Sequence, residues 1–424
     1  MKAEVLTIGD ELLRGEIVDS NKSFLSERLL RLDVETHFHS SVRDDPADMT
    51  DAFRRAAERA GVVLVSGGLG PTRDDLTIEV LARCFERKLV LHEPSLAAIR
   101  AFYQRVGREM PEINAKQAWM PEGAEVLPNP IGTAPGCMLL VGEVPFFCMP
   151  GVPRELYRMM DEQVLPRIEA RHPARAVVRA RILRTFGMGE SNLEEALTGV
   201  ARGGEITLGF RTAFPDNLLR PLTRAATPAE ADARLDAVCA EIRERLGPLV
   251  YAEGEESLEE VVGRLLRERG RTLAVAESCT GGLIAERITR VAGSSDYFVG
   301  GVVAYANSAK RELLGVPAEL LDRHGAVSEP AAKAMAEGVR ARLRSDFGIG
   351  TTGISGPGGG TPDKPVGTVC VALASAEGTH VERFVFPLDR DRHRSLTAQL
   401  ALDWVRRSLL GVPLVAPTLM RRTK

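Results

Sequence analysis

The sequence predicts an α/β protein built from three units, and two observations lead to that prediction. Short apolar runs typical of buried strands alternate with amphipathic stretches of helical periodicity, as in parallel sheets covered by helices. The chain also has 424 residues, which exceeds one hydrophobic core because domains average roughly 150 residues. We expect two α/β domains, residues 1–172 and 257–413, with a small α+β module at residues 173–253 between them.

The first unit shows a strand, a turn rich in glycine or proline, and a helix three times over. The strands are residues 4–8, 62–66 and 146–149, the turns are residues 9–11, 67–75 and 150–153, and the helices are residues 21–31, 76–85 and 154–167. Ligands collect at the carboxyl ends of parallel strands, where all three turns lie. We therefore expect a binding site at this edge of the sheet.

Acidic residues gather around those turns: Asp10, Glu11, Asp19, Asp44, Asp74 and Asp75. Carboxylates beside backbone N–H groups that can hold a phosphate suit a hard divalent ion such as Mg²⁺, which bridges acid and phosphate oxygens. We expect Asp44, Asp74 and Asp75 to be metal ligands. Helix capping is the alternative role for Asp10 and Asp75.

The middle unit has a different order of elements. A strand is followed by a helix at residues 192–200, a strand pair at residues 206–210 and 218–225, a helix at residues 228–246 and a short strand. This order predicts an α+β module, which a polar, glycine-containing linker at residues 252–256 joins to the third unit.

In the third unit, Ser278 lies where a strand turns into a helix. The segment Ala-Glu-Ser-Cys-Thr-Gly-Gly at residues 276–282 overlaps the end of the apolar run at residues 273–276. A hydroxyl there is presented beside backbone N–H groups that can stabilise an oxyanion, which predicts a nucleophile. An N-cap role is the alternative for Ser278. Cys279 is a rival nucleophile, although its position favours a small buried residue facing the sheet.

Lys310 is the candidate base for Ser278. The histidines of this unit lie outside any motif, and we expect surface or capping roles for them: His324, His380 and His393. A lysine base must be neutral, and lowering its pKa from about 10.4 to about 7.5 requires roughly 4 kcal/mol, of which a helix N-terminus typically supplies about 0.3 to 1. Desolvation must supply the rest, so the amine should be enclosed beside Ser278 and Tyr305.

A glycine-rich loop occupies residues 353–360, with the sequence Gly-Ile-Ser-Gly-Pro-Gly-Gly-Gly. So few side chains cannot pack a core, but they let the backbone approach a ligand such as a phosphate. An ordinary surface loop is the alternative.

Composition excludes several classes of protein. The net charge is −3 with acids and bases intermixed, which gives no surface field for nucleic acid or membranes. The six cysteines are scattered without a C-x-x-C pair, which favours reduced thiols over disulfides or zinc. The longest apolar stretch, residues 137–152, is interrupted by Glu143 and Pro145. We expect a soluble cytoplasmic protein with no membrane partner and no nucleic-acid partner.

Four motifs in the same order resemble the CinA family (competence/damage-inducible protein A) over nearly the whole chain. They are residues 9–13 with 19–21, residues 67–72 with 74–75, residues 276–282 and residues 353–369. The resemblance implies a bifunctional pyridine-nucleotide hydrolase that forms a homodimer. Its first domain would have the molybdopterin-binding fold and cleave ADP-ribose to AMP and ribose 5-phosphate with potassium and a divalent metal, Mg²⁺ or Co²⁺. Its last domain would deamidate nicotinamide mononucleotide (NMN) to nicotinate mononucleotide and ammonia without a cofactor.

The same resemblance implies the site residues. In the last domain Ser278 is the nucleophile, and Tyr305 and Lys310 complete the catalytic site. The substrate-binding residues of the last domain are Thr280, Gly281, Gly282, Asn307, Gly353, Ser355, Gly356 and Thr368. Those of the first domain are Gly9, Asp10, Gly67, Gly68, Gly70, Thr72, Pro150 and Gly151.

The middle module would be KH-like, but the sequence departs from that fold's pattern. Its Gly187-Met188-Gly189 is too short for the G-x-x-G clamp, which argues against RNA binding. The first domain also departs from its molybdopterin-binding relatives, since Leu69 stands where they usually have threonine. That difference favours a nucleotide over a pterin.

Two other functions remain open. In one, only the last domain is catalytic and the first is a nucleotide- or pterin-binding module. In the other, the chain is a nucleic-acid-associated competence factor. The net charge of −3 argues against this function, as does the lack of a stripe of clustered Lys and Arg residues.

Overall fold

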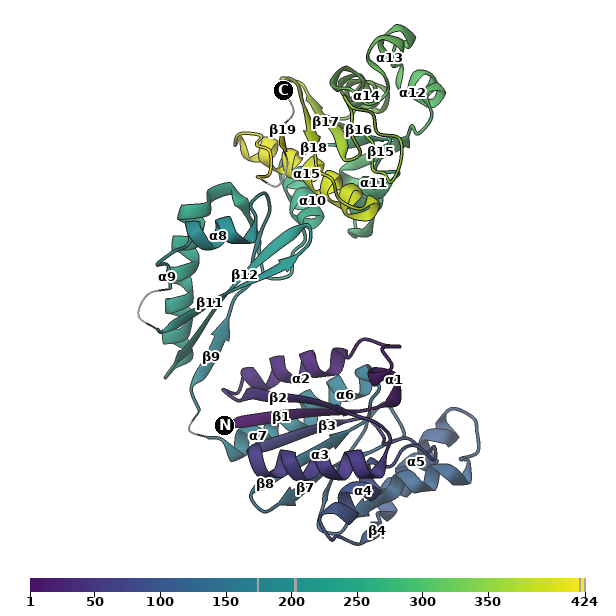
Figure 1. Ribbon diagram of the computed structural model, residues 1–424, viewed down its shortest axis with the longest axis vertical. Helices are drawn as coiled ribbons and strands as arrows, with labels where there is room; N and C mark the ends of the chain where they lie inside the picture. The colour runs from purple at the N-terminus through teal and green to yellow at the C-terminus, as the bar shows by residue number, and fades with distance from the viewer. Residues whose placement is uncertain (174, 202–203, 419–420, 423–424) are drawn as a thin grey trace. The chain divides into compact units, whose positions relative to one another are not determined.

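The computed structural model describes residues 1–173, 175–201, 204–418 and 421–422, and it confirms the α/β class (Figure 1). The chain forms two compact units, one of Met1–Arg179 with Arg224–Ala231 and one of Ala180–Thr223 with Asp232–Lys424. All six cysteines are free thiols, as predicted. Within the described ranges, no helix combines the length and apolarity needed to cross a bilayer.

The first domain is built on a six-stranded sheet in the order β2-β1-β3-β8-β7-β6. The strands in this order are β2 (Glu35–Val42), β1 (Lys2–Ile8), β3 (Val62–Ser66), β8 (Val144–Met149), β7 (Gly136–Val141) and β6 (Glu125–Leu127). The first four are parallel, whereas β7 runs antiparallel to both β8 and β6. The prediction of a parallel sheet is therefore right for the centre and wrong for this edge, because β7 and β8 form a hairpin that needs no crossover helix.

Helices cover both faces of this sheet because alternate strand residues point to opposite sides. Val5 and Leu64 face α2 (Ser20–Leu30) and the segment formed by α6 (Pro153–Met159), the π-helix η2 (Met160–Val164) and α7 (Leu165–Arg171). Leu6 and Val63 face α3 (Pro46–Arg59) and α4 (Thr77–Cys84). The remaining elements are α1 (Asp10–Leu13), β4 (Leu89–Leu91), α5 (Glu93–Arg105), η1 (Glu112–Ala118) and β5 (Trp119–Pro121).

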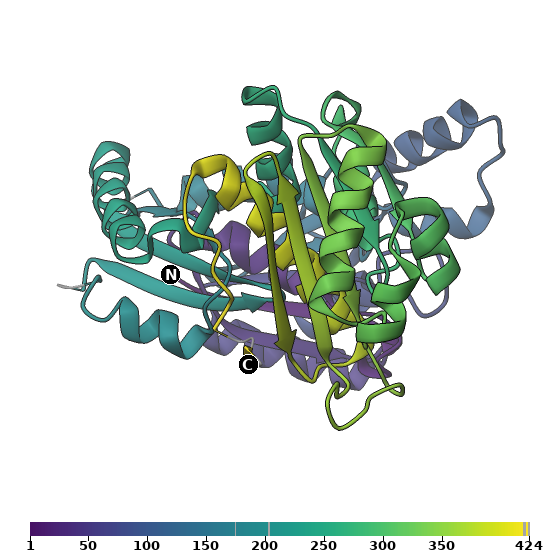
Figure 2. The same cartoon turned by 90° about the horizontal axis from the view of Figure 1, so that it is seen from above.

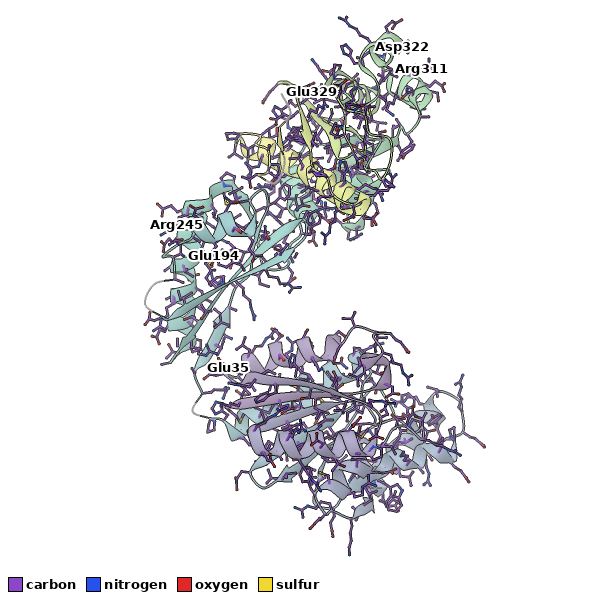
Figure 3. All side chains as sticks on the ribbon, viewed as in Figure 1. Glu35, Glu194, Arg245, Arg311, Asp322 and Glu329 are labelled. Carbon is purple, nitrogen blue, oxygen red and sulfur yellow. The ribbon has the colours of Figure 1, made fainter. Side chains whose placement is uncertain are left out.

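The middle module is α+β as predicted, but two strands rather than one precede its first helix. Its elements are β9 (Val177–Ala180), β10 (Leu183–Thr185), α8 (Glu190–Ala196), β11 (Ile206–Ala213), β12 (Asp216–Ala225), α9 (Pro228–Leu246), η3 (Gly247–Leu249) and β13 (Val250–Glu253). The strands form the antiparallel order β11-β12-β10-β13, and β9 pairs with β12. On α9, the guanidinium of Arg245 donates to the carbonyls of Ala196 and Thr198, which fastens the end of α8 to α9 (Figure 3).

The last domain has a second six-stranded sheet in the order β15-β14-β16-β17-β18-β19. The strands in this order are β15 (Phe298–Val303), β14 (Leu273–Glu277), β16 (Phe347–Gly353), β17 (Thr368–Ser375), β18 (Gly378–Val385) and β19 (Arg421–Arg422). The helices are α10 (Leu258–Glu268), α11 (Leu283–Arg290), α12 (Asn307–Leu314), α13 (Ala318–His324), α14 (Glu329–Leu343) and α15 (Arg390–Leu410). Only β15, β14 and β16 are parallel.

The two faces of this sheet differ in the size of the residues that β14 contributes to them. Leu273 and Val275 pack in the cluster of α10, α11 and α15, whereas the smaller Ala274 and Ala276 pack in the cluster of α14. Figure 2 shows α14, in green, and α15, in yellow, on opposite faces of the sheet. A Cβ atom at Gly350 would come within 2.3 Å of the Ala332 carbonyl, so α14 packs directly on the backbone of β16. The parallel strands of each mixed sheet thus bring several strand ends together at one edge.

The buried core of α15 contains a charged group. Asp403 accepts from Arg406 Nε at 2.8 Å and from Arg407 Nε at 2.6 Å, and all three residues are at most 3% exposed. Arg406 also donates to the Pro248 carbonyl of the middle module at 2.6 Å. The single carboxylate thus serves as the shared counter-charge of two buried guanidinium groups.

Replacing Asp403 by Ala should lower the free energy of unfolding by roughly 3 to 5 kcal/mol, because two buried cations lose their counter-charge. Urea unfolding followed by Trp404 fluorescence measures this, since Trp404 is fully buried in the same helix. The matched control is Asp391→Ala at the exposed start of α15, with an expected change under about 0.5 kcal/mol. Equal stability of the two variants would contradict the role given to Asp403.

Candidate active sites

Glu277 at the end of β14 shapes the turn that carries Ser278. Its fully buried carboxylate accepts the backbone N–H groups of Gly282, Ile284 and Ala285 at 3.0, 3.1 and 2.9 Å. These are donors of the first turn of α11, so Glu277 caps that helix and no side chain at its N-cap does. The alternative of Ser278 as an N-cap residue is therefore wrong, and its hydroxyl is free for another partner.

That partner is the amine of Lys310, which is 1% exposed. Lys310 Nζ lies 3.1 Å from Ser278 Oγ, 2.9 Å from the Ala304 carbonyl and 3.0 Å from the Tyr305 carbonyl. Burial lowers the pKa of Lys310 below that of an ordinary lysine. The next residue on α12, Arg311, is exposed instead (Figure 3). The enclosure expected for a lysine base is thus observed.

The three partners fit both forms of the amine: the ammonium donates to all three, whereas the neutral amine donates to the carbonyls and accepts from the hydroxyl. Two of them are carbonyl oxygens, which only accept hydrogen bonds, and the third is a hydroxyl, which can also donate. A neutral amine has two N–H groups for the carbonyls of Ala304 and Tyr305, and its lone pair then faces the Ser278 O–H. The arrangement can therefore remove a proton from Ser278.

Cys279 points into the core between the sheet and α11. It is 6% exposed, and burial raises the pKa of its thiol to about 12. A thiol with this pKa stays protonated at neutral pH and is a poor nucleophile. The interpretation of Cys279 as a small core residue is confirmed.

Tyr305 approaches Lys310 through its backbone rather than its ring. Its side chain is 63% exposed, and the phenol accepts from Arg390 Nη2 at 3.2 Å. Arg390 also donates to the Gly356 carbonyl at 2.9 Å, and Arg394 donates to the Thr280 carbonyl at 2.9 and 3.1 Å. The first turns of α15 therefore fasten the glycine-rich loop to the Ser278 turn.

Arg390 and Arg394 were missed by the sequence analysis. The sequence did contain an indication of their role. Arginines in the first turns of a helix interact unfavourably with the helix dipole, so their presence there indicates an additional binding or structural role. Their long sequence separation from the loops they contact, 114 residues for Arg394 and Thr280, hid that role.

His393 corrects another expectation. It is fully buried rather than a surface or capping residue, its Nδ1 lies 2.9 Å from Ser355 Oγ, and its Nε2 lies 3.2 Å from the Gly367 carbonyl. Burial lowers the pKa of His393 to about 4, so the ring is neutral at pH 7. Because a carbonyl only accepts, Nε2 carries the proton and Nδ1 accepts from Ser355. The ring thereby ties Ser355 of the glycine-rich loop to Gly367, the residue before β17.

The other predicted residues of the last domain lie in the turns and at the element ends that follow β14, β15 and β16, or at the start of β17. Gly281 and Gly282 have positive φ values of 62° and 94°, which the turn into α11 requires. Thr280 and Thr368 are fully buried, with their hydroxyls bonded to Thr351 and to the Pro365 carbonyl. Gly353 ends β16 beside Thr368, and exposed Asn307 begins α12.

In the first domain a cavity of about 530 Å³ lies at the carboxyl edge of the parallel strands, and we call it the acidic cavity. Nine predicted residues line it: Gly9, Asp44, Gly67, Gly68, Gly70, Asp74, Asp75, Pro150 and Gly151. Glu11, Gln117, Thr133 and Glu155 also line it and were not predicted as site residues. The glycine turn is packed too tightly for side chains, since a Cβ atom at Gly67 would lie 2.2 Å from the Ile8 carbonyl.

Asp10 and Thr72 do not line this cavity. The Asp10 carboxylate pairs with Arg14 at 2.5 Å and Arg43 at 3.4 Å, and Thr72 donates its hydroxyl to Asp74 and Asp75. Neither Asp10 nor Asp75 caps a helix, because the N-cap residues of α1 and α4 are Gly9 and Leu76, and the Asp10 N–H at the start of α1 donates to the Asp44 carboxylate instead. The capping alternative is wrong for both.

The neighbouring carboxylates of the first domain affect the pKa of Asp44. Burial raises the pKa of Asp44, and the neighbouring Glu11, Asp10 and Asp74 raise it further. Among the described residues, no three His, Cys, Asp or Glu side chains are grouped to hold one metal ion, so the expected ligands Asp44, Asp74 and Asp75 do not form one three-carboxylate site. A divalent cation bound here would be coordinated by one or two carboxylates, and phosphate or water oxygens would complete its coordination shell. Mg²⁺ is usually bound in this way.

Comparisons with known proteins agree with this arrangement. Three family models match: a "probable molybdopterin binding domain" at residues 4–170, a "damage-inducible protein CinA KH domain" at 180–252 and a "CinA C-terminal domain" at 255–409. A CinA-like protein of Geobacter sulfurreducens is 45% identical over 411 residues, covering 97% of this chain and all of its own length. The chain belongs to the CinA family.

Another relative and a solved structure are also similar to this chain. A CinA-like protein of Dictyoglomus thermophilum is 42% identical over 413 residues, again covering 97% of this chain and all of its own length. A solved structure, described as the protein CinA with unknown function from Thermoplasma acidophilum, is 34% identical and covers 39% of this chain and 97% of its own, with a TM-score of 0.37.

The lowered pKa of Lys310 should appear in the pH dependence of stability. Below the pKa of Lys310 in the folded chain, the lysine is protonated in both the folded and the unfolded chain, and the free-energy cost of burying its charge is fully present. Above the ordinary pKa of about 10.4 the lysine is neutral in both, and this cost is gone. Between the two, wild-type stability should gain up to about 1.4 kcal/mol per pH unit relative to Lys310→Met, which has no such titration.

Urea unfolding at several pH values from about 7 to 10 measures this difference. Lys333→Met on α14 is the control, because that side chain is 52% exposed and its substitution should give a pH-independent difference. A pH-independent difference for Lys310→Met as well would contradict the lowered pKa.

Proposed function

We propose that the last domain hydrolyses the carboxamide of NMN to nicotinate mononucleotide and ammonia. The observation that carries the proposal is the enclosed Lys310 amine 3.1 Å from Ser278 Oγ, held between two backbone carbonyls. A serine activated by a neutral lysine is suited to acyl transfer. The carbonyl carbon of a pyridinium carboxamide is electron-poor, and a nucleophile such as Ser278 Oγ therefore attacks it readily.

The reaction proceeds through an ester on Ser278. Lys310 Nζ accepts the hydroxyl proton while Ser278 Oγ bonds to the carboxamide carbon. The carbon–nitrogen bond then breaks, and the departing nitrogen takes the proton from Lys310 and leaves as ammonia. Water attacks the ester with Lys310 as base again, the proton returns to Ser278 Oγ, and the nucleotide leaves as a carboxylic acid.

Arg390 and Arg394 support a phosphorylated substrate. Both guanidinium groups lie at the glycine-rich loop and the Ser278 turn. Arg390 donates to a carbonyl and a phenol, neither of which carries a negative charge, whereas Arg394 donates to the Thr280 carbonyl and lies 3.7 Å from the Asp391 carboxylate. A substrate phosphate would supply the missing anion, and the side-chain-poor backbone of both turns would let it approach. In this proposal the phenol of Tyr305, bonded to Arg390, helps to orient that arginine.

We further propose that the first domain hydrolyses ADP-ribose to AMP and ribose 5-phosphate. The acidic cavity combines the backbone of the glycine turn, which suits phosphates, with carboxylates that repel one another. Asp44 and Asp74 would hold a divalent ion, Mg²⁺ or Co²⁺, and the ion supplies charge neutralisation to the phosphates when bound. The potassium requirement, the cytoplasmic location and the homodimer are proposed on the family resemblance; light scattering of the full chain tests the homodimer.

Ser278→Ala should abolish ammonia release from NMN, with a loss of at least about 100-fold, because no acyl bond can form. Cys279→Ala is the matched control and should keep most of the activity, since its thiol is protonated. Wild-type turnover should also rise with pH as Lys310 loses its proton. Activity retained by Ser278→Ala and lost in Cys279→Ala would make the thiol the nucleophile.

Asp44→Asn should lower metal-dependent cleavage of ADP-ribose at least about tenfold while deamidation stays unchanged, because the amide keeps the shape but loses the charge. The control is Asp51→Asn, an exposed carboxylate on α3 that pairs only with Arg55 among the recorded ion pairs. Products are identified with and without added Mg²⁺ or Co²⁺. Binding of ADP-ribose without cleavage by the wild type would make the first domain a nucleotide-binding module instead.

A further inference from the structure

The tip of the β11–β12 hairpin belongs to the middle module but contacts α15 of the last domain. The guanidinium carbon of Arg392 lies over the Phe214 ring, 5.6 Å from its centroid. The carboxylate of Asp216, whose side chain is 14% exposed, accepts from Gln399 Nε2 at 2.5 Å and from the Tyr251 hydroxyl at 2.5 Å. The tip is thus joined to α15 at two points.

These two points lie on one face of α15, and the arginines of the candidate active site lie on the opposite face. A helix has about 3.6 residues per turn, so Arg392 and Gln399, which are two turns apart, project in nearly the same direction. By the same geometry Arg390 and Arg394 project to the other side, where they donate to carbonyls of the glycine-rich loop and the Ser278 turn. The first half of α15 is therefore held between the hairpin tip and the loops of the site.

Gln399 also connects the hairpin tip to the helix that follows Ser278. Gln399 is 1% exposed, and its Oε1 accepts from Arg287 Nη2 on α11 at 2.6 Å. Arg287 donates in turn to Glu259 on α10 at 2.6 Å. The amide can make both of its bonds in one orientation only, because a carboxylate accepts and a guanidinium donates. Asp216 thereby fixes α15 relative to α11.

The charge of Asp216 is kept at a cost in stability. Burial raises the pKa of Asp216 to about 6, although Tyr251, Arg287 and Arg184 lower it. Because the pKa is raised, ionisation destabilises the folded chain: the cost is absent below the ordinary pKa of about 3.9 and fully present above about pH 6. A charged group retained at such a cost indicates a role other than packing.

We propose that the hairpin tip positions the start of α15 for the substrate phosphate, with Phe214 and Asp216 as the positioning residues. The proposal rests on the proposed deamidase function and deepens it, because it gives the middle module a part in binding NMN. The tip supports α15 from the side opposite Arg390 and Arg394. Its loss should therefore weaken the binding of the phosphate, while the hydrogen bond between Ser278 and Lys310 stays in place.

The test compares deamidation of NMN and of nicotinamide riboside, which lacks the phosphate, by the full chain. The double variant Phe214→Ala with Asp216→Ala should raise KM for NMN at least about tenfold and change kcat less than about twofold, because phosphate binding contributes equally before and during the reaction. Turnover of the riboside should stay unchanged. Asp216→Asn should behave like the wild type, since its amide oxygen still accepts from Gln399.

Arg220→Ala, at an exposed position of β12, is the matched control and should leave both substrates unaffected. Equal losses with NMN and the riboside, or an unchanged KM for NMN in the double variant, would overturn the proposal. A loss in Asp216→Asn as large as in the double variant would also contradict it, because the hydrogen bond to Gln399 would then not be what matters.

Hydrogen–deuterium exchange separates this proposal from the proposed function, because it requires no turnover. The double variant should exchange faster than the wild type at residues 353–360 and 390–394. Faster exchange in a chain that does not deamidate NMN would retain the positioning of α15 and refute only the deamidase. Unchanged exchange at both segments would overturn the positioning.

Discussion

The buried carboxylate of Glu277 is the interaction on which the catalytic turn of the last domain depends. By accepting three N–H groups at the start of α11, it satisfies donors that a serine hydroxyl often satisfies elsewhere. Ser278 is thereby released from a structural role, and its hydroxyl meets the amine of Lys310. The backbone carbonyls of Ala304 and Tyr305 hold that amine, so a main chain whose path is set by β15 and α12 positions the base.

Burial shifts the pKa values of the key residues of the two candidate sites in opposite directions. In the last domain, desolvation lowers the pKa of Lys310 and favours a neutral base. In the first domain, burial and three acidic neighbours raise the pKa of Asp44, which leaves a place where a cation would be stabilising. Both sites lie at the carboxyl edge of parallel strands, because only there do several loops meet. The antiparallel strands of each sheet extend the core and leave that edge to the site.

Helix α15 serves both the core and the site. Its centre buries Trp404 and the ion pairs of Asp403, while its first turns carry Arg390, His393 and Arg394. Placing cations at a helix N-terminus opposes the helix dipole. Carbonyls of Thr280 and Gly356 offset that cost, so the loops and the helix start stabilise one another.

The sequence by itself determined the strand, turn and helix units, the acidic character of the first site and the pairing of Ser278 with an enclosed Lys310. Periodicity and turn chemistry act over a few residues, so they can be read locally. Only the tertiary structure decided that Asp10 turns toward Arg14 and Arg43, that the Tyr305 ring faces outward, and that His393 is a buried neutral ring. It also decided that Glu277 rather than Ser278 caps α11. The physical reason is that burial and hydrogen-bond partners come from segments distant in the chain, as with Arg394 and Thr280, and no local pattern records which segments will meet.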